Sequence, residues 1–268
     1  GEADIKGLGT QRQMLNVRGK FVPVISLGEM TGAKDPITDP TKGVLVLVET
    51  ESHGQAAMLV DAINNRKPSG ASESTVLGPF HVEGAPELPM GANICLDQKG
   101  EDMVVSGRIL DTDGQPIRDA VIDVWQANDE GFYDVQQKGI QPDFNLRGIF
   151  RTGPDGRYWF RAVKPRFYPI PDDGPVGQLL GQLGRHPYRP AHLHYIIKAD
   201  GFETLTTHIF DPHDRYINSD AVFGVKESLL AEFRKIDDAD RARELEFAGS
   251  FWDVEHDFVL ARKGGTGR

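Results

Sequence analysis

Residues 189–195 read RPAHLHY, which places two histidines two positions apart. The apolar and aromatic residues around them are typical of a β-strand. Successive side chains of a strand point to opposite faces, so His192 and His194 share one face and Leu193 points to the other. Two imidazoles on one face can bind one metal ion, but paired strand histidines are also common surface features. Further ligands are needed to decide between the two interpretations.

Carboxylates and thiolates near this strand do not complete such a site. No Asp or Glu lies between Arg185 and Ile197, so the familiar set of two histidines and one carboxylate has no local candidate. Cys95 is the single cysteine of the chain. Two tyrosines end turn-like segments instead: Tyr133 follows NDEGF, and Tyr168 lies in KPRFYPIPDDGP. Spacing alone does not select them, because most tyrosines are half-buried aromatics with a hydrogen-bonded hydroxyl.

The chain that must position these residues is expected to be mainly β. From about residue 100, short alternating runs separated by turn signals predict a β-sandwich. These runs are 103–110, 120–127, 147–152, 157–163, 193–199, 204–210 and 251–260. The segment GPDG at 153–156 predicts a tight hairpin between the runs on either side.

A short, partly helical region is expected before the sandwich, with the two domains covering residues 1–75 and 76–268. Apolar residues at helical spacing predict a short helix over 55–64. Two more helices are expected, over 175–184 and over 221–236. Ser219 or Asp220 would cap the second of these.

Composition favours a small-molecule partner and a cytoplasmic protein. The formal net charge is −10 and the basic residues are scattered, which argues against a nucleic-acid surface. One cysteine excludes an internal disulfide and suits a reducing compartment. The N-terminus lacks the pattern of a signal peptide, and the longest apolar run, VLVLV at 44–48, is too short to span a membrane.

Several long blocks, taken in order, resemble the intradiol ring-cleavage dioxygenases. The similar stretch runs from 76 to 229 and contains GPF followed by EGAP, SGRILDTDGQPIRDAVIDVWQANDEGFYD, FNLRGIFRTGPDGRYWF, GRHPYRPAHLHYII and LTTHIF. The resemblance implies a β-sandwich catalytic domain with one Fe(III) per chain, held by Tyr133, Tyr168, His192 and His194. Phenolate oxygens are hard anionic donors, and a bound cation favours the phenolate over the phenol, so this ligand set suits ferric iron.

The same resemblance implies cleavage of a catechol-type ring by O2 between its two hydroxylated carbons. Tyr168 would leave the metal to act as a base. Arg189 would place a guanidinium beside the ring to stabilise developing negative charge, although a solvated surface arginine is the alternative. His208 stands where catechol-cleaving members commonly carry glutamine, and it could hydrogen-bond to an iron-bound oxygen.

Pocket walls are also carried over from the family. The aligned positions are Met58, Asp61, Ala62, Val76, Leu77, Gly78, Pro79 and Phe80. A carboxylate at 61 could accept a hydrogen bond from a third ring hydroxyl. With GASESTVLGPF and SDAVFGVK, this makes the chain most similar to the members that convert hydroxyquinol to 3-hydroxy-cis,cis-muconate (maleylacetate).

Two other interpretations stay open. The substrate could be catechol or a chlorocatechol, which would give a cis,cis-muconate, whereas no basic pair is evident for a substrate carboxylate such as that of protocatechuate. A sandwich of this size could also be a non-enzymatic ligand-binding module, since fold does not determine function. Relatives dimerise through a longer helical N-terminal domain that can hold a lipid. A homodimer is therefore expected here only by resemblance, without a nucleic-acid or membrane partner.

Overall fold

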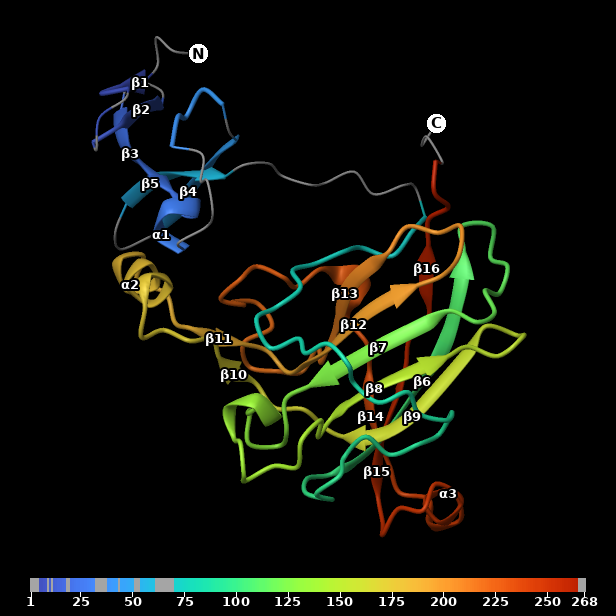
Figure 1. Ribbon diagram of the computed structural model, residues 1–268. Helices are drawn as coiled ribbons and strands as arrows, with labels where there is room; N and C mark the ends of the chain where they lie inside the picture. The colour runs from blue at the N-terminus through green and yellow to red at the C-terminus, as the bar shows by residue number, and fades with distance from the viewer. Residues whose placement is uncertain are drawn as a thin grey trace. The chain divides into compact units, whose positions relative to one another are not determined.

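The chain divides into two units in a computed structural model (Figure 1). The first unit comprises residues 1–66 and 170–187, and the second comprises residues 67–169 and 188–268. The sequence predicted the division between residues 75 and 76, which is a little further along the chain than the boundary between residues 66 and 67. The structure describes residues 5–8, 10, 12–17, 20–31, 38–42, 44–50, 54–60 and 70–264.

The first unit is built on a five-stranded sheet in the order β1-β2-β3-β5-β4. Its strands are β1 (Ile5–Lys6), β2 (Met14–Val17), β3 (Lys20–Ser26), β4 (Val44–Thr50) and β5 (Gly54–Val60). Its helices are α1 (Leu27–Thr31) and α2 (Pro175–Gln182), and α2 confirms the helix predicted over 175–184. The helix predicted over 55–64 is wrong, because its described part is β5, which pairs with β3 and β4. A short apolar run fits a buried strand as well as a helix, and the spacing alone could not distinguish them.

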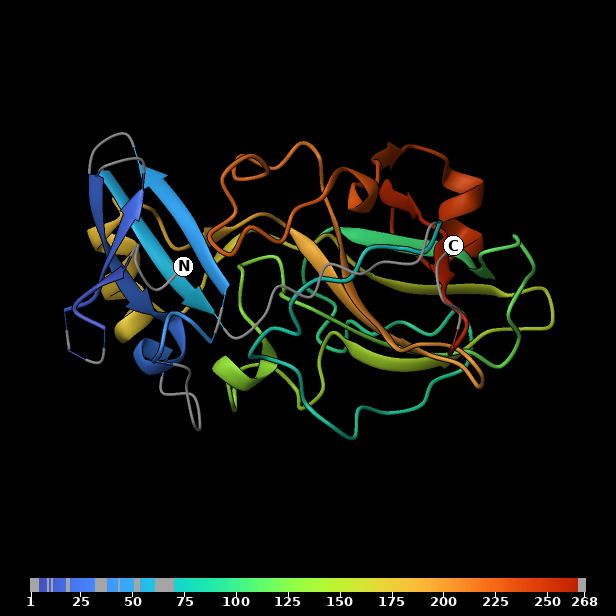
Figure 2. The ribbon, with the colours of Figure 1, turned by 90° about the horizontal axis from the view of Figure 1, so that it is seen from above.

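The second unit is the predicted β-sandwich (Figure 2). One sheet has the order β13-β12-β7-β8, with β13 (Leu205–Phe210), β12 (His192–Lys198), β7 (Val121–Gln126) and β8 (Arg147–Arg151). The other contains β14 (Phe233–Ile236), β15 (Phe251–Glu255), β16 (Phe258–Leu260), β6 (Asp102–Asp111) and β9 (Arg157–Val163). In this sheet β6 pairs with β9 along one edge and with β15 and then β16 along the other.

The core lies between these two sheets and follows the period of two in their strands. Leu193, Tyr195 and Ile197 of β12 are fully buried there, as are Val105 of β6 and Phe160 of β9. Each buried side chain of this size contributes about 1.5–3 kcal/mol relative to exposure. This energy orients β12, so the residues between the core positions must point to the outer face of its sheet.

The turn at 153–156 does not form the predicted hairpin. The strand before it, β8, pairs with β7, whereas the strand after it, β9, pairs with β6 of the other sheet. Gly156 donates its N–H to the carbonyl of Gly153, so the turn is tight as expected. It carries the chain from one layer of the sandwich to the other, and turn chemistry alone does not reveal which strand lies beside which.

The helix predicted over 221–236 is also wrong. Leu229, Ala231 and Phe233 are buried at alternate positions, which is the period of an extended chain and not of a helix. The segment contains a single 3₁₀ turn, η3 (Glu227–Leu229), followed by β14, which pairs with β15. Asp220 caps no helix, because its carboxylate binds other groups near the site.

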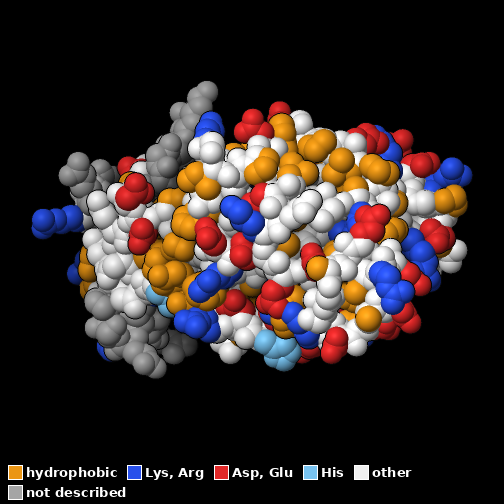
Figure 3. Space-filling model, turned by 90° about the horizontal axis from the view of Figure 1, so that it is seen from below, with side chains coloured by type: hydrophobic (Ala, Val, Ile, Leu, Met, Phe, Trp, Pro, Cys, Tyr) orange, Lys and Arg blue, Asp and Glu red, His pale blue; other side chains and the backbone are white. Residues whose placement is uncertain are grey.

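A two-stranded ribbon and two short helical elements complete the second unit. The ribbon pairs β10 (Tyr168–Pro169) with β11 (Tyr188–Arg189). The helical elements are η2 (Asp134–Gln136) and α3 (Ala239–Glu244). Among the described residues, no helix combines the length and apolar character needed to cross a membrane. On the face shown in Figure 3, acidic and basic side chains are interspersed over the sandwich.

Gly107 lies at the point along β6 where the neighbouring strand changes from β15 to β16. The packing there leaves no room for a side chain. A Cβ at this position would lie 1.9 Å from the carbonyl oxygen of His256. We therefore expect Gly107→Ala to lower the free energy of unfolding by about 1–3 kcal/mol or more, measured by equilibrium denaturation. Gly249→Ala is the matched control, because a Cβ there meets no atom within 4 Å. Equal stability of the two variants would contradict the strand arrangement around β6.

Candidate metal centre

His192 and His194 lie side by side on the outer face of the four-stranded sheet, as the alternation of β12 requires. Each is only 1% exposed. His208 of β13 is the cross-strand partner of His194, so it projects from the same face. The imidazole centroids of His194 and His208 are 4.2 Å apart. Three histidines are thus buried together on two neighbouring strands.

The hydrogen bonds of His192 define which of its nitrogens faces the centre. Its Nδ1 lies 2.6 Å from the carbonyl oxygen of Pro190, which can only accept, so Nδ1 carries the proton. Its Nε2 lies 3.1 Å from Nη1 of Arg189, which can only donate. Metal-binding histidines commonly hold one ring N–H on a backbone carbonyl in this way, leaving the other nitrogen free to bind.

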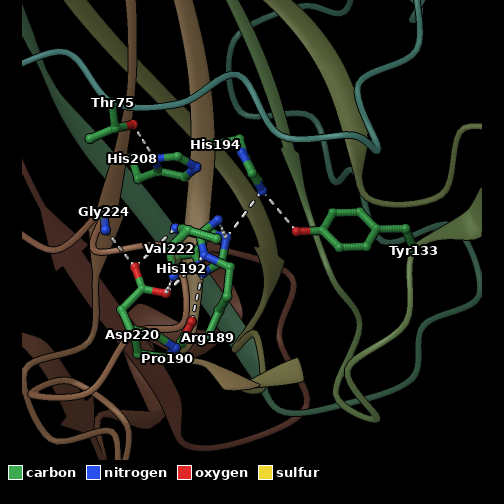
Figure 4. Close-up of polar contacts among 10 residues, drawn as sticks. All are labelled: Thr75, Tyr133, Arg189, Pro190, His192, His194, His208, Asp220, Val222 and Gly224. Atoms are coloured by element: carbon green, nitrogen blue, oxygen red, sulfur yellow. Dashed lines mark hydrogen bonds and ion pairs between the residues drawn. The ribbon is translucent and has the colours of Figure 1, made fainter. Parts of the chain in front are cut away.

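His194 brings a second nitrogen lone pair to the same point. Its Nε2 lies 3.1 Å from Nε2 of His192 and 2.8 Å from the hydroxyl of Tyr133, which donates to it (Figure 4). Burial is the main reason that the pKa values of both imidazoles lie well below the usual value, and Arg189 lowers them further. Both rings are therefore neutral, and their Nε2 atoms lie at a separation at which one cation could bind both.

The two tyrosines approach the pair from separate segments. Tyr133 follows β7 at the start of η2, where its backbone N–H donates to Oε1 of Gln136 at 2.9 Å. Tyr168 belongs to the β10–β11 ribbon, and its buried hydroxyl has no hydrogen-bond partner among the described residues. The Tyr168 ring centroid lies 5.1 Å from that of Tyr133 and 5.4 Å from that of His192. Burial, and then the neighbouring phenol, raise the pKa of Tyr133 well above its usual value.

Aromatic residues enclose these donors. Trp125 of β7 stacks on His194 with ring centroids 4.6 Å apart and planes 11° apart. Phe80 stacks on Tyr133, also at 4.6 Å. Gly78 passes so close to His194 that a Cβ would lie 2.8 Å from Cε1 of the imidazole. The segment that contains Gly78 and Phe80 therefore covers the outer face of β12.

His208 is held differently from the other two histidines. Its Nδ1 forms a short hydrogen bond with the hydroxyl of Thr75, and its Nε2 is buried without a partner in the part of the chain that the structure describes. One ligand atom from each of His192, His194 and His208 lies within 4.8 Å of the others. His208 is thus close enough to contact a group bound between the other two.

Two buried arginine–carboxylate pairs flank the centre. Arg189 binds Asp220 through Nε at 3.1 Å and through Nη2 at 3.3 Å, and both side chains are 2% exposed. Arg147 donates from Nε to Asp134 at 2.8 Å. Asp134 directly follows Tyr133 in the chain, so this second pair anchors the segment that carries the first tyrosine. The desolvation of four charged groups is offset here by pairing each cation with an anion.

The donor set fits a single metal ion. Ligand atoms bound at about 2.1 Å to one ion lie about 3.0–3.4 Å apart for angles of about 90–110°, which matches the separation of the two Nε2 atoms. The buried hydroxyl of Tyr168, which has no hydrogen-bond partner among the described residues, is costly without an ion. A cation would lower the pKa of Tyr133 and supply the missing partner of Tyr168. The described residues therefore offer two imidazoles and two phenols to one metal.

The chain belongs to the dioxygenase family. The family model described as "Dioxygenase" matches residues 77–261, which is more than half of the chain and covers the whole cluster of histidines and tyrosines. The resemblance to the intradiol ring-cleavage enzymes is confirmed by the relatives and solved structures that match. Members of this family are enzymes that contain non-haem iron.

The relatives include proteins named for two related substrates. The hydroxyquinol 1,2-dioxygenase of Rhizobium sp. (strain MTP-10005) is 80% identical over 207 residues, which are 77% of this chain and 70% of that protein. The catechol 1,2-dioxygenase of Candida albicans (strain SC5314 / ATCC MYA-2876) is 41% identical over 186 residues, 68% of this chain and 61% of that protein. The crystal structure of hydroxyquinol 1,2-dioxygenase from Pseudomonas putida DLL-E4 superposes with a TM-score of 0.69 at 42% identity, covering 75% of this chain and 70% of that one.

The N-terminal part of the chain matches a different family. Residues 3–67 match the CheW-like domain. Met58, Asp61 and Ala62, expected to line the ring slot, lie within this match. Met58 belongs to β5 of the first unit, and Asp61 and Ala62 lie outside the described residues. Their place in the slot stays a prediction.

The remaining predicted pocket residues belong to the second unit. Val76 and Leu77 are each 48% exposed, and they lie between Thr75, which binds His208, and Gly78, which contacts His194. Pro79 is also exposed. This stretch therefore presents apolar surface beside the donors, as a wall for an aromatic ring requires.

Sequence reasoning did not identify several residues that hold the site. These are Thr75, Trp125, Asp134, Arg147 and Asp220. Trp125 and Arg147 lie within blocks recognised as similar to the family, but no spacing rule links them to the histidines. Asp220 was noted only as a helix cap. Long-range pairs of this kind leave no local pattern in a sequence.

Removing either strand histidine should remove most of the bound metal. We expect His192→Ala and His194→Ala to lower the metal content per chain at least about tenfold, measured by elemental analysis, because each deletes a direct ligand. His213→Ala is the control, since this side chain is 72% exposed and pairs with Glu232. Equal metal loss in the control would show that the metal binds elsewhere.

Proposed function

We propose that this enzyme cleaves hydroxyquinol with O2 by intradiol ring opening, giving 3-hydroxy-cis,cis-muconate (maleylacetate). The reaction would take place at one Fe(III) per chain, held by Tyr133, Tyr168, His192 and His194. The observation that carries the proposal is that Nε2 of His194 lies 3.1 Å from Nε2 of His192 and 2.8 Å from the Tyr133 hydroxyl, with the buried ring of Tyr168 beside them. The Rhizobium relative, 80% identical, is named for hydroxyquinol and supports the choice of substrate.

A ferric ion at this point would bind both oxygens of an aromatic diolate and draw electron density from the ring. The two protons of the incoming diol must therefore be taken up, one by Tyr168, which would hold the ion as a phenolate and leave it as a phenol, and the other by a hydroxide from solvent. Tyr168 is suited to this role because its oxygen is buried, has no hydrogen-bond partner among the described residues and lies on a short ribbon at the edge of the site. Tyr133 is less suited to dissociate from the ion, because it already contacts His194 and its segment is anchored by the Asp134–Arg147 pair.

Three side chains are placed to act on the bound ring. Arg189 directs Nη1 toward the donors, where its fixed positive charge would stabilise negative charge on the substrate. His208 would offer its unpartnered Nε2 to an oxygen at the centre, with Thr75 holding its other nitrogen. Phe80 would restrict the ring plane, since it already packs face to face with Tyr133.

Catechol or a chlorocatechol is the second candidate substrate, favoured by the Candida relative that is named for catechol. The conserved chemistry of the centre would be the same, and only contacts to ring substituents would differ. A homodimer and a cytoplasmic location complete the proposal, and both rest on the sequence alone.

Tyrosine-to-iron charge transfer would give the protein a red-brown colour. Tyr133→Phe and Tyr168→Phe should each shift or weaken the visible band while preserving the fold, because each change removes one oxygen and almost no volume. Absorption spectra of iron-loaded protein, with circular dichroism for the fold, test this. Tyr158→Phe is the control, since Tyr158 belongs to β9 of the other sheet and its hydroxyl donates to the carbonyl oxygen of His256. Unchanged spectra in both site variants would exclude these tyrosines as ligands.

Hydroxyquinol should have a higher specificity constant than catechol, by about ten times or more, because a group that hydrogen-bonds the third hydroxyl is left unpaired by catechol. Oxygen uptake with each substrate measures the ratio. Asp61 is the candidate for that group from the sequence, and Asp61→Ala should reduce the ratio by one to two powers of ten, the value of a hydrogen bond to a charged group at about 1.5–3 kcal/mol. A wild-type preference for catechol would instead support the second candidate.

A further inference from the structure

The guanidinium of Arg189 is held by one short segment, residues 220–224. Asp220 receives Nε and Nη2 on its two carboxylate oxygens, at 3.1 and 3.3 Å. The same carboxylate accepts the backbone N–H groups of Val222 at 3.3 Å and Gly224 at 2.8 Å (Figure 4). Four donors thus fix the carboxylate, and the carboxylate fixes two of the three guanidinium nitrogens.

The third guanidinium nitrogen, Nη1, is the one that faces the histidines of the metal centre. Nη1 makes no contact with Asp220 and lies 3.1 Å from Nε2 of His192. Because the guanidinium is planar, holding Nε and Nη2 in a two-point pair also determines where Nη1 points. A monodentate contact would leave the plane free to rotate about the bond to the carboxylate.

Gly224 completes the fit through the absence of a side chain. A Cβ at this position would lie 2.9 Å from Nη2 of Arg189 and 3.1 Å from Oδ2 of Asp220. The backbone of Gly224 does not adopt the left-handed conformation that demands glycine. The close approach to the guanidinium therefore explains the glycine better than backbone strain does.

We propose that Asp220 and Gly224 are positioning residues, which aim Nη1 of Arg189 at the reacting substrate and so control the rate of ring cleavage. The inference rests on the proposed function, because Arg189 must act on a substrate bound at the centre. In the described part of the chain, both residues contact the guanidinium of Arg189. We expect their effect on the centre to be transmitted through that guanidinium.

Gly224→Ala is the sharpest test, because it displaces the guanidinium while keeping both charges of the ion pair. We expect kcat for hydroxyquinol to fall by about a hundredfold, since a misplacement of about 1 Å costs this much, with KM changed less than threefold. Iron content and the visible band of the resting enzyme should stay at wild-type values. Gly249→Ala is the control, because a Cβ there meets no atom within 4 Å.

Asp220→Asn provides a second, independent variant. The amide keeps the shape of the carboxylate but presents N–H where Nε or Nη2 must donate, so one of the two contacts is lost. We expect a loss of kcat at least as large as in Gly224→Ala, and Asp220→Glu should recover part of it by restoring both acceptors. If Asp220→Asn does not fold, Gly224→Ala still decides the question.

The outcomes separate this inference from the proposed function. Wild-type protein without iron or ring-cleaving activity would refute the proposed function itself. Active wild-type protein with an unchanged kcat in folded Gly224→Ala would refute only the positioning role. A loss of iron in Gly224→Ala would also refute it, because the segment would then support the ligands and not Arg189.

Discussion

The centre depends on one strand that has to satisfy two environments. On its inner face, β12 contributes Leu193, Tyr195 and Ile197 to the core, and on its outer face it presents His192 and His194. The apolar contacts hold the strand in register, and a shift by one residue would exchange the two sets of side chains. The precision of the donors is therefore supplied by hydrophobic packing on the opposite side of the same sheet.

The charges and protonation states around the histidines and tyrosines then determine which ion this site can bind. The imidazoles are kept neutral by burial, and the same desolvation raises the pKa of Tyr133. Arg147 and Arg189 beside them are paired with Asp134 and Asp220. Within the described residues, the donor atoms thus lie beside cations that carboxylates balance, and a bound metal ion would add the positive charge that favours a phenolate over a phenol.

The sequence was informative wherever a local period decided the structure. The strands β6, β7, β8, β9, β12 and β13 of the sandwich, and α2, were predicted correctly, because their apolar residues recur at the right spacing. The segments over 55–64 and 221–236 were predicted as helices and contain β5 and β14, since a short apolar run fits both periods and pairing with a distant strand decided between them. The turn at 153–156 was recognised, but not the change of sheet that it makes.

The residues of the candidate site also fall into those that a local pattern predicts and those that it does not. The shared face of His192 and His194 follows from strand geometry, whereas Tyr133 and Tyr168 could be selected only through resemblance to a family. The partners of Arg189 and of Asp134, which follows Tyr133, were not predicted, because Asp220 and Arg147 reach them across the fold. Sequence distance hides these pairs: Asp220 lies 31 residues beyond Arg189, and Arg147 pairs with Asp134 13 residues before it.

The β10–β11 ribbon has a consequence for how such enzymes diversify. Tyr168 and Arg189 are paired across it, while the residues between, 170–187, belong to the other unit. The ribbon holds the two ends of segment 170–187 together. Tyr168 and the guanidinium of Arg189 therefore keep their register when that segment changes. Because closing a longer loop costs little once its ends are held, evolution can lengthen, shorten or replace residues 170–187 without retuning the chemistry. Sequence changes in this fold can therefore be tolerated within a few residues of Tyr168 and Arg189.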